Sequence, residues 1–139
     1  MIETTLFDKK GHPAAYISAD FRQTIFLWSG IPVAYIYAEE YIYGINGLHL
    51  GWFRDGILFN NSGERIGFTF SNCPVAVAKV PAKGKKQAVE KVRPRWHAQS
   101  HPKFLVNFAD QDLEDFLSEG LVSRLEERDP LKNIWIEEP

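Results

Sequence analysis

Four stretches of this chain share one pattern, and that pattern decides the fold. They are FDKKGHPAAYI (7–17), FLWSGIPVAYIY (26–37), YGINGLHLGWF (43–53) and FNNSGERIGFTF (59–70). Each contains a glycine with one aromatic residue four positions before it and another five positions after it. Self-similarity at a short period is typical of repeat architectures, in which one unit cannot bury its hydrophobic face alone. The first half of the chain is therefore expected to hold four copies of one small unit.

The repeat extends over five columns around each glycine. An aliphatic residue or alanine stands three positions after the glycine, a small residue four after, and another aliphatic residue five before. The glycines are Gly11, Gly30, Gly47 and Gly63, and the small residues are Ala15, Ala34, Gly51 and Gly67. Five matching columns in four copies are not a chance pattern in so short a segment.

Each copy has the pattern of a β-hairpin. The central dipeptides, of which Asn46-Gly47 is the strongest, place glycine where a tight turn needs a positive φ. If each dipeptide is a two-residue loop, the aromatic residue before it pairs with the aliphatic residue three after the glycine. The small residue then pairs with the aliphatic residue five before. Both faces are largely apolar, so four hairpins are expected to bury their faces against one another.

The column of small residues has a meaning of its own. An alanine or glycine in a strand gives up packing area and usually marks a close approach of other atoms. Four such positions at equivalent places predict a crowded centre around a pseudo-fourfold axis. The expected architecture is therefore mainly β, with four hairpin repeats arranged as a rosette.

These four stretches, over residues 5–70, resemble the bacterial domain described as a four-fold β-flower. The motifs are specific as a set, although one copy alone is a weak signal. The resemblance implies the rosette fold, and it implies no established activity and no catalytic residues. Residues 71–139 have no counterpart in this resemblance.

Charge divides the rest of the chain. Residues 79–103 carry eight Lys or Arg against Glu90 alone, a net +7, and residues 104–139 carry three against ten, a net −7. We therefore expect three parts: a hairpin domain over 1–78, a basic loop or linker over 79–103, and an acidic helical segment over 104–139 packed on the first.

Local patterns predict elements in the second half. The run Val75–Val80 is β-prone and is expected to add an edge strand. Residues 81–102 have little apolar periodicity, which predicts a mobile basic loop. Beyond it, apolar residues at helical spacing predict an amphipathic helix that begins at Asp110 or Asp112 and runs to about Arg128. Gly120 weakens this helix, so two short helices are the alternative. With this helix, the chain as a whole is expected to be α+β.

Catalytic and metal-binding patterns are missing. The single cysteine, Cys73, lies before a proline with no nearby histidine, so a structural role is favoured. His97 and His101 have the spacing of zinc proteases, but the accompanying glutamate motif is absent and Pro102 disfavours a helix. The sequence therefore predicts no catalytic residues, no metal and no cofactor, and an enzyme with a cleft at the rosette axis is the least favoured reading.

The basic segment is the one candidate binding surface. Its candidate residues are Lys83, Lys85, Lys86, Lys91, Arg93, Arg95 and Trp96. Six cations beside an aromatic ring can neutralise phosphates and stack on a base. The favoured alternative is a solvated loop whose charge is offset within the molecule, by docking on the acidic helix around Asp112, Glu114 and Asp115.

These observations predict a structural or protein-interaction module, with a nucleic-acid-binding protein as the alternative. A protein partner or self-association is favoured over nucleic acid, and any small-molecule ligand is left open. A chain of 139 residues that is 45% hydrophobic and 24% charged is neither disordered nor fibrous. With one cysteine, no long apolar run and no secretory pattern at its start, it is expected to be soluble and cytoplasmic, without membrane contact.

Overall fold

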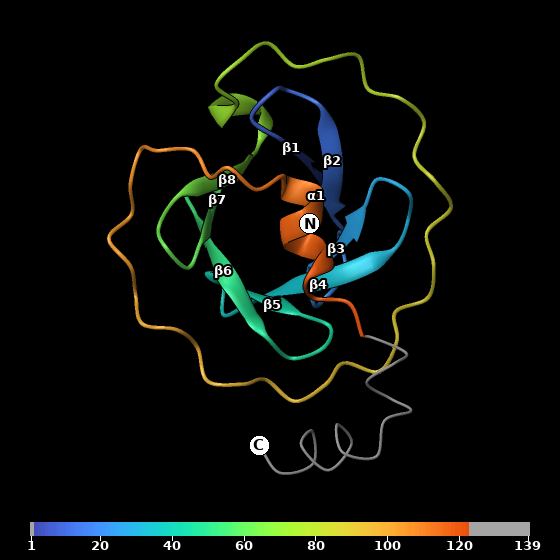
Figure 1. Cartoon of the computed structure of the whole chain (residues 1–139). Coiled ribbons are helices and arrows are strands. Elements are labelled where there is room, and N and C mark those ends of the chain that lie inside the picture. Colours follow the sequence, from blue (N-terminus) through green and yellow to red (C-terminus); the bar gives the residue numbers. More distant parts are fainter. Residues whose placement is uncertain (1, 123–139) are drawn as a thin grey trace.

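Eight antiparallel strands close into one barrel in the computed structural model, which describes residues 2–122 (Figure 1). The strands are β1 (Thr4–Phe7), β2 (Pro13–Ile17), β3 (Thr24–Leu27), β4 (Pro32–Tyr37), β5 (Tyr41–Gly44), β6 (His49–Arg54), β7 (Ile57–Asn60) and β8 (Arg65–Phe68). Consecutive pairs form the four predicted hairpins, so the mainly β fold of four hairpin repeats is confirmed. The barrel closes through a single pair, Phe7 with Phe68.

Each hairpin turn contains three residues rather than the predicted two. In the first hairpin the N–H of Asp8 donates to the carbonyl of His12 at 2.9 Å, and the N–H of Gly11 donates to the carbonyl of Asp8 at 3.0 Å. Gly11 has a φ of 83°. This is a turn closed by a glycine bulge, which needs the left-handed conformation that glycine adopts freely.

The bulge changes half of the predicted pairing. Leu6 pairs with Ala15 as expected, but Phe7 pairs with Pro13 rather than with Ala14. The other three hairpins show the same shift at the same place. The bulge adds one residue to the second strand of each hairpin. The aromatic residue of the first strand therefore pairs with the residue two positions after the turn glycine, not with the residue three positions after it.

The two faces of the barrel wall have different side chains. The interior is filled by the aliphatic and small columns of the repeat, including Leu6, Ile25, Ile42 and Leu58. The aromatic columns alternate with them and therefore point outward. These eight residues, called here the aromatic belt, are Phe7, Tyr16, Phe26, Tyr35, Tyr43, Trp52, Phe59 and Phe68, and all are buried. An outward-pointing residue is buried only if something covers the barrel from outside.

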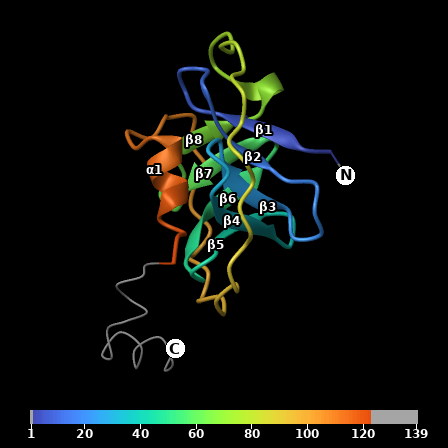
Figure 2. The ribbon, with the colours of Figure 1, turned by 90° about the vertical axis from the view of Figure 1, so that its right-hand side faces the viewer.

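A short helix, α1 (Leu113–Ser118), packs into one end of the barrel. Figure 1 shows α1 over the barrel axis, and Figure 2 shows it at the end opposite the N-terminus. Its apolar residues Leu113, Phe116 and Leu117 are buried in the interior core. The crowded centre that the small residues predict is thus made by strands and helix together.

The helix is shorter than predicted. Asp112 is its N-cap as one of the two expected starts, but the helix ends at Ser118. Gly120 lies against the barrel, where an added Cβ would stand 2.2 Å from the carbonyl oxygen of Val33. The backbone at Gly120 therefore lies directly against β4, two residues after the helix ends. The predicted continuation to Arg128 falls partly on residues 123–128, which lie outside the described residues.

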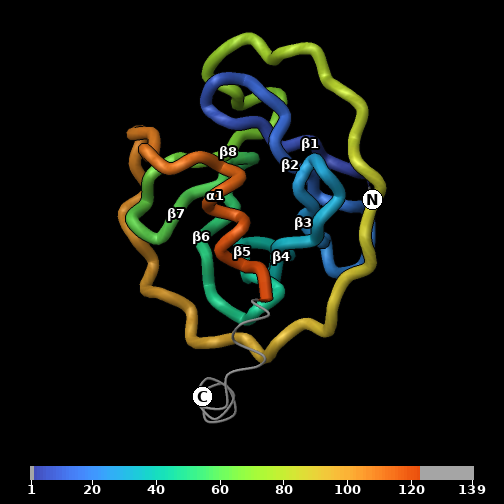
Figure 3. The backbone as a smooth tube through the Cα atoms, turned by 45° about the vertical axis from the view of Figure 1, so that its right-hand side comes forward, coloured from blue at the N-terminus to red at the C-terminus, as the bar shows by residue number. Residues whose placement is uncertain are grey.

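The segment between barrel and helix runs around the outside of the barrel (Figures 1 and 3). It follows the 3₁₀ turn η1 (Phe70–Asn72), and we call residues 74–109 the girdle. The predicted edge strand at Val75–Val80 is wrong, because this part of the girdle is an irregular extended chain. A closed barrel leaves it no free strand edge to pair with. Near its end the girdle makes one bridge to the sheet, between Phe108 and Arg65.

Candidate functional site

The girdle is bound to the four hairpin turns at a regular interval. Backbone N–H groups nine residues apart donate to the carbonyls of the four turn glycines. The pairs are Ala78 to Gly11 at 2.8 Å, Gln87 to Gly30 at 2.9 Å, Trp96 to Gly47 at 2.9 Å and Leu105 to Gly63 at 2.9 Å. The girdle therefore repeats the fourfold symmetry of the barrel, with one such hydrogen bond to the turn glycine of each hairpin.

The turn glycines also leave room for the girdle backbone. A Cβ on Gly30 would stand 2.0 Å from the carbonyl oxygen of Lys85, and a Cβ on Gly47 would stand 2.2 Å from that of Pro94. Real Cβ atoms do not approach backbone so closely. Glycine is thus required at these turns both for its φ and for the contact with the girdle.

Two of the predicted site residues are stacked on the aromatic belt. The Lys83 Nζ lies 4.4 Å from the centroid of the Tyr16 ring and pairs with the Glu3 carboxylate. The Lys86 Nζ lies 4.8 Å from the centroid of Phe26 and 2.8 Å from the Ser18 hydroxyl. Cations over aromatic faces are attracted by the ring quadrupole. Lys83 and Lys86 therefore help to hold the girdle on the barrel.

Arg95 is held by two tyrosines further along the girdle. Its guanidinium carbon lies 3.7 Å from the centroid of Tyr37, and its Nη1 lies 3.4 Å from the hydroxyl of Tyr35. The hydrogen bond with Tyr35 raises the pKa of Arg95 further above its ordinary value, so the positive charge is permanent. The side chain is nevertheless exposed to solvent.

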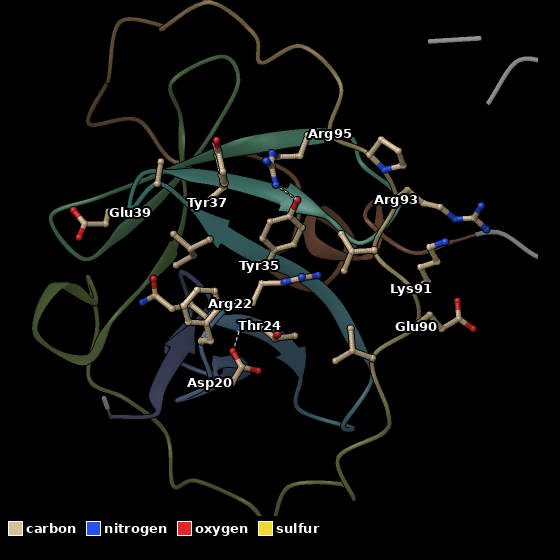
Figure 4. A pocket seen from close by; sticks show the side chains of 17 residues that line it. Asp20, Arg22, Thr24, Tyr35, Tyr37, Glu39, Glu90, Lys91, Arg93 and Arg95 are labelled. Carbon is tan, nitrogen blue, oxygen red and sulfur yellow. Dashed lines mark hydrogen bonds between the residues drawn. The ribbon is translucent and has the colours of Figure 1, made fainter. Parts of the chain in front are cut away.

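A groove of about 1350 Å³ lies beside Arg95 (Figure 4). It is lined by the turn between β2 and β3 with the first residue of β3 (20–24), the end of β4 with the following turn (35–39), and the girdle (89–95). Across the groove the Arg22 guanidinium carbon lies 5.6 Å from the centroid of Tyr35. In Figure 4 the Tyr35 side chain lies between those of Arg22 and Arg95.

The predicted site residues divide into groups. Lys91, Arg93 and Arg95 line the groove, whereas Lys83 and Lys86 lie over the first hairpin and β3. Lys85 presents its backbone to Gly30, and Trp96 lies against Gly47. The structure therefore gathers three of the seven predicted residues at one site.

A family model described as the 4-fold beta flower protein matches residues 4–117 of the chain. The chain belongs to this family. The match extends beyond the four stretches at 5–70 and takes in the girdle and nearly all of α1. The reading that residues 71–139 have no counterpart in the family is therefore wrong for 71–117. Neither a curated protein nor a solved structure matches the chain.

Several residues that line the groove of this β-flower were not predicted from the sequence as site residues. Phe21 and Arg22 come from a turn between two copies of the repeat, and Phe21 belongs to no column of it. That mismatch is the one signal that points to the turn. Tyr35 and Tyr37 carry no separate signal, because they look like further members of an apolar strand.

The predicted docking of the basic segment on the acidic helix is not found at Asp112, Glu114 or Asp115. Among residues 2–122, no ion pair joins the girdle to Asp112, Glu114 or Asp115. Lys83 instead pairs with Glu3, and His101 lies 3.9 Å from Glu40. The reason is geometric: the girdle runs around the barrel wall, while α1 lies at the barrel end.

The part of the β-flower that the structure describes contains no group of three His, Cys, Asp or Glu side chains able to hold a metal ion. Within residues 2–122 there is also no helix long and apolar enough to cross a membrane. The groove instead offers guanidinium groups, aromatic faces and an open shape. Such groups bind anionic and apolar ligands by non-covalent contacts.

Proposed function

We propose that this β-flower protein is a protein-interaction module whose groove binds an acidic segment of a partner protein, with one apolar side chain beside the acidic residues. The observation that carries the proposal is the arrangement of Arg22 and Arg95 around Tyr35, next to an exposed phenylalanine. Arginine, tyrosine and phenylalanine are the residues enriched in binding interfaces.

The first support is the state of the two guanidinium groups. Among the described residues, neither Arg22 nor Arg95 forms an ion pair, so both charges are available to a carboxylate. Arg95 is also restrained by its stacking on Tyr37 and its hydrogen bond to Tyr35. A side chain that is already ordered loses less entropy on binding, which favours affinity.

The second support is the apolar surface at the groove. Phe21 is fully exposed, and Tyr37 and Val89 are exposed by 41% and 39%. An exposed apolar patch often marks an interaction site. These three side chains line the same groove as Arg22 and Arg95. An apolar residue of the partner would pack here while its acidic neighbours reach the arginines.

The third support is the placement of the groove's own acids. Figure 4 shows Glu39 and Glu90 at opposite ends of the groove, while Arg22 and Arg95 lie in its middle. Asp20 is turned to its own backbone, where it accepts the N–H of Thr24 at 2.9 Å. The middle of the groove is therefore positive, and it suits a short acidic segment.

A selection from a library of short random peptides displayed on phage, with the full chain as bait, tests this proposal. We expect selected peptides to carry two or more acidic residues beside an aromatic or aliphatic one. Arg95→Ala should weaken the best peptide by about tenfold or more. Arg54→Ala is the matched control, since Arg54 stacks on Phe104, 4.6 Å from its centroid and outside the groove. No enrichment, or equal weakening by the control, would overturn the proposal.

Nucleic acid is the second candidate, because the girdle carries a row of cations over aromatic rings. Binding of a fluorescent single-stranded DNA or RNA at two salt concentrations tests it. Phosphate binding predicts an affinity that falls with salt by a slope of about −0.7 per phosphate contacted. We favour the protein partner, since Lys83 and Lys86 already have partners on the barrel. Salt-dependent binding of the nucleic acid that Arg95→Ala abolishes would reverse this preference.

The cysteine content of the chain bears on the cellular compartment in which the protein works. The single cysteine cannot form a disulfide within the chain, and Cys73 is only partly exposed. We infer a reducing compartment such as the cytoplasm, in which free thiols persist.

A further inference from the structure

A buried histidine that does not line the groove lies between the barrel and the girdle. His49, the first residue of β6, is 7% exposed. Its Nδ1 accepts a hydrogen bond from the backbone N–H of Gln99 in the girdle at 2.9 Å. Its Nε2 is buried and has no hydrogen-bond partner among the described residues. A buried polar atom without a partner is rare and calls for an explanation.

The surroundings of His49 are aromatic. Its ring centroid lies 4.7 Å from that of Trp52, in an edge-to-face arrangement, and 5.2 Å from that of Tyr43. Tyr41 lies on the same side, 5.7 Å away. The ring of His101 in the girdle contacts that of Trp52, with centroids 4.2 Å apart and the two planes tilted by 52°. The imidazole is therefore enclosed by rings that offer no anion.

We propose that His49 is a pH-sensitive latch, which holds this part of the girdle when its imidazole is neutral and releases it when the imidazole is protonated. The proposal goes beyond the groove and its ligand, and neither depends on the other.

The hydrogen bond to Gln99 decides where the second proton must go. Because Nδ1 of His49 accepts an N–H, the single proton of the neutral ring is on Nε2. Protonation therefore adds a proton to Nδ1, the atom that faces the Gln99 N–H. Two donors then point at each other, and the bond that fixes the girdle at this point is lost.

The charged groups around the ring do not compensate. Burial lowers the pKa of His49 from its ordinary value of 6.5; the nearby backbone of Gly51 acts in the opposite direction, and positive charge on His101 lowers this pKa further. The Arg95 guanidinium carbon lies 5.9 Å from the centroid of Tyr43, one of the rings that enclose His49. Glu40 lies beside His101 rather than His49.

The direction in which pH changes the opening of the girdle follows from the pKa of His49 in the open and the closed states. In the open girdle the imidazole regains its ordinary pKa of 6.5, whereas in the closed girdle its pKa is lower. Protons therefore bind the open state preferentially below pH 6.5. The opening equilibrium should rise by up to about tenfold for each pH unit, until the closed state is protonated as well. Above pH 6.5 the latch should be insensitive to pH.

The test is amide hydrogen exchange of the full chain between about pH 7.5 and pH 5, with each rate divided by that of an unstructured peptide. We expect the protection of Gln99 in the wild type to fall as the pH drops below 6.5, by no more than about tenfold for each pH unit. His49→Asn keeps an acceptor near the Nδ1 position but cannot titrate, so its protection should not change with pH. His101→Gln removes the neighbouring titratable ring and should leave the response in place.

A second measurement needs no variant. Nitrogen chemical shifts of the His49 ring report its tautomer and its protonation directly in the wild type. We expect the proton on Nε2 at neutral pH, and a shift of the Gln99 amide that follows the titration of His49. The proposal is overturned if His49→Asn responds to pH as the wild type does, or if the Gln99 amide does not change while the His49 ring titrates.

Discussion

A Cβ atom on Gly51 would stand 2.9 Å from the Cζ of Phe116, so the wall of the barrel touches α1 at one of the small residues of the repeat. Gly67 has the same relation to Leu113, also at 2.9 Å. The column of small residues that marks the repeat therefore leaves space for the helix. The small residues Gly51 and Gly67 in the first half of the chain are therefore explained by Phe116 and Leu113 in the second half.

Replacing Gly51 with leucine should destabilise the protein by roughly 1–3 kcal/mol or more through overpacking. The new side chain would meet both Phe116 and the carbonyl oxygen of Phe59, 2.1 Å from an added Cβ. Gly67→Ala is the comparison, since its Cβ meets only the ends of a flexible leucine and the Cβ of Leu58. Urea unfolding should show a larger loss for Gly51→Leu, and an unchanged midpoint would contradict the close packing of the barrel end.

Replacing Gly30 with alanine should loosen the girdle as well as strain the turn. The strain of a positive φ costs about 1–2 kcal/mol for a residue with a Cβ. Gly56→Ala shares that strain at a φ of 77°, but its Cβ would meet side chains of Thr69 and Asn72 rather than the girdle. The N–H of Gly84 in the girdle donates to the carbonyl of Trp28 beside this turn, at 2.8 Å, so its hydrogen exchange should rise in Gly30→Ala alone. Equal exchange in the two variants would argue against the contact.

Replacing Lys83 and Lys86 together with alanine should increase hydrogen exchange at Gln87 and leave that at Phe116 unchanged. Each cation–aromatic contact contributes about 0.5–1 kcal/mol at an exposed site. Lys85→Ala is the control, because that side chain is exposed on the same segment. Faster exchange in α1 would instead revive the docking of the basic segment on the acidic helix.

Replacing Asn46 with alanine should loosen the end of α1. The Asn46 side-chain amide donates to the carbonyls of Glu119 and Leu121, at 2.8 and 3.2 Å. Loss of these bonds should cost roughly 1 kcal/mol. Ser62→Ala, at the equivalent position of the fourth hairpin, is the control, and only Asn46→Ala should lower the protection of the Gly120 amide.

The barrel was predictable because its repeat is carried by side chains. Repeated positions such as those of Ile42 and Gly51, which pair across a hairpin, show which face of each strand is turned inward. Because side chains alternate between the two faces of a strand, the other interior residues follow. The turn length was not predictable, since Lys10-Gly11 fits either a two-residue loop or the end of a three-residue turn. A glycine preceded by a polar residue is compatible with both turn lengths, so it does not distinguish them.

The girdle was not predictable because backbone atoms hold it. Ala78, Gln87, Trp96 and Leu105 occupy equivalent places but share no side-chain property, so their nine-residue interval leaves no pattern in the sequence. The groove depends on the path of the girdle, which brings Arg95 to Tyr35 across 60 residues. Basic composition alone indicated a surface without indicating which cations meet.

The most direct test of the proposed function is a chemical-shift map of the full chain with the tightest peptide from the selection. We expect shifts of the backbone amides of Phe21, Arg22 and Tyr35 and of the Arg95 side-chain Nε, and none near Arg54. Arg95→Ala should remove these shifts while the barrel signals stay in place. Shifts centred on Arg54 and Phe104, or shifts that persist in Arg95→Ala, would contradict binding in the groove.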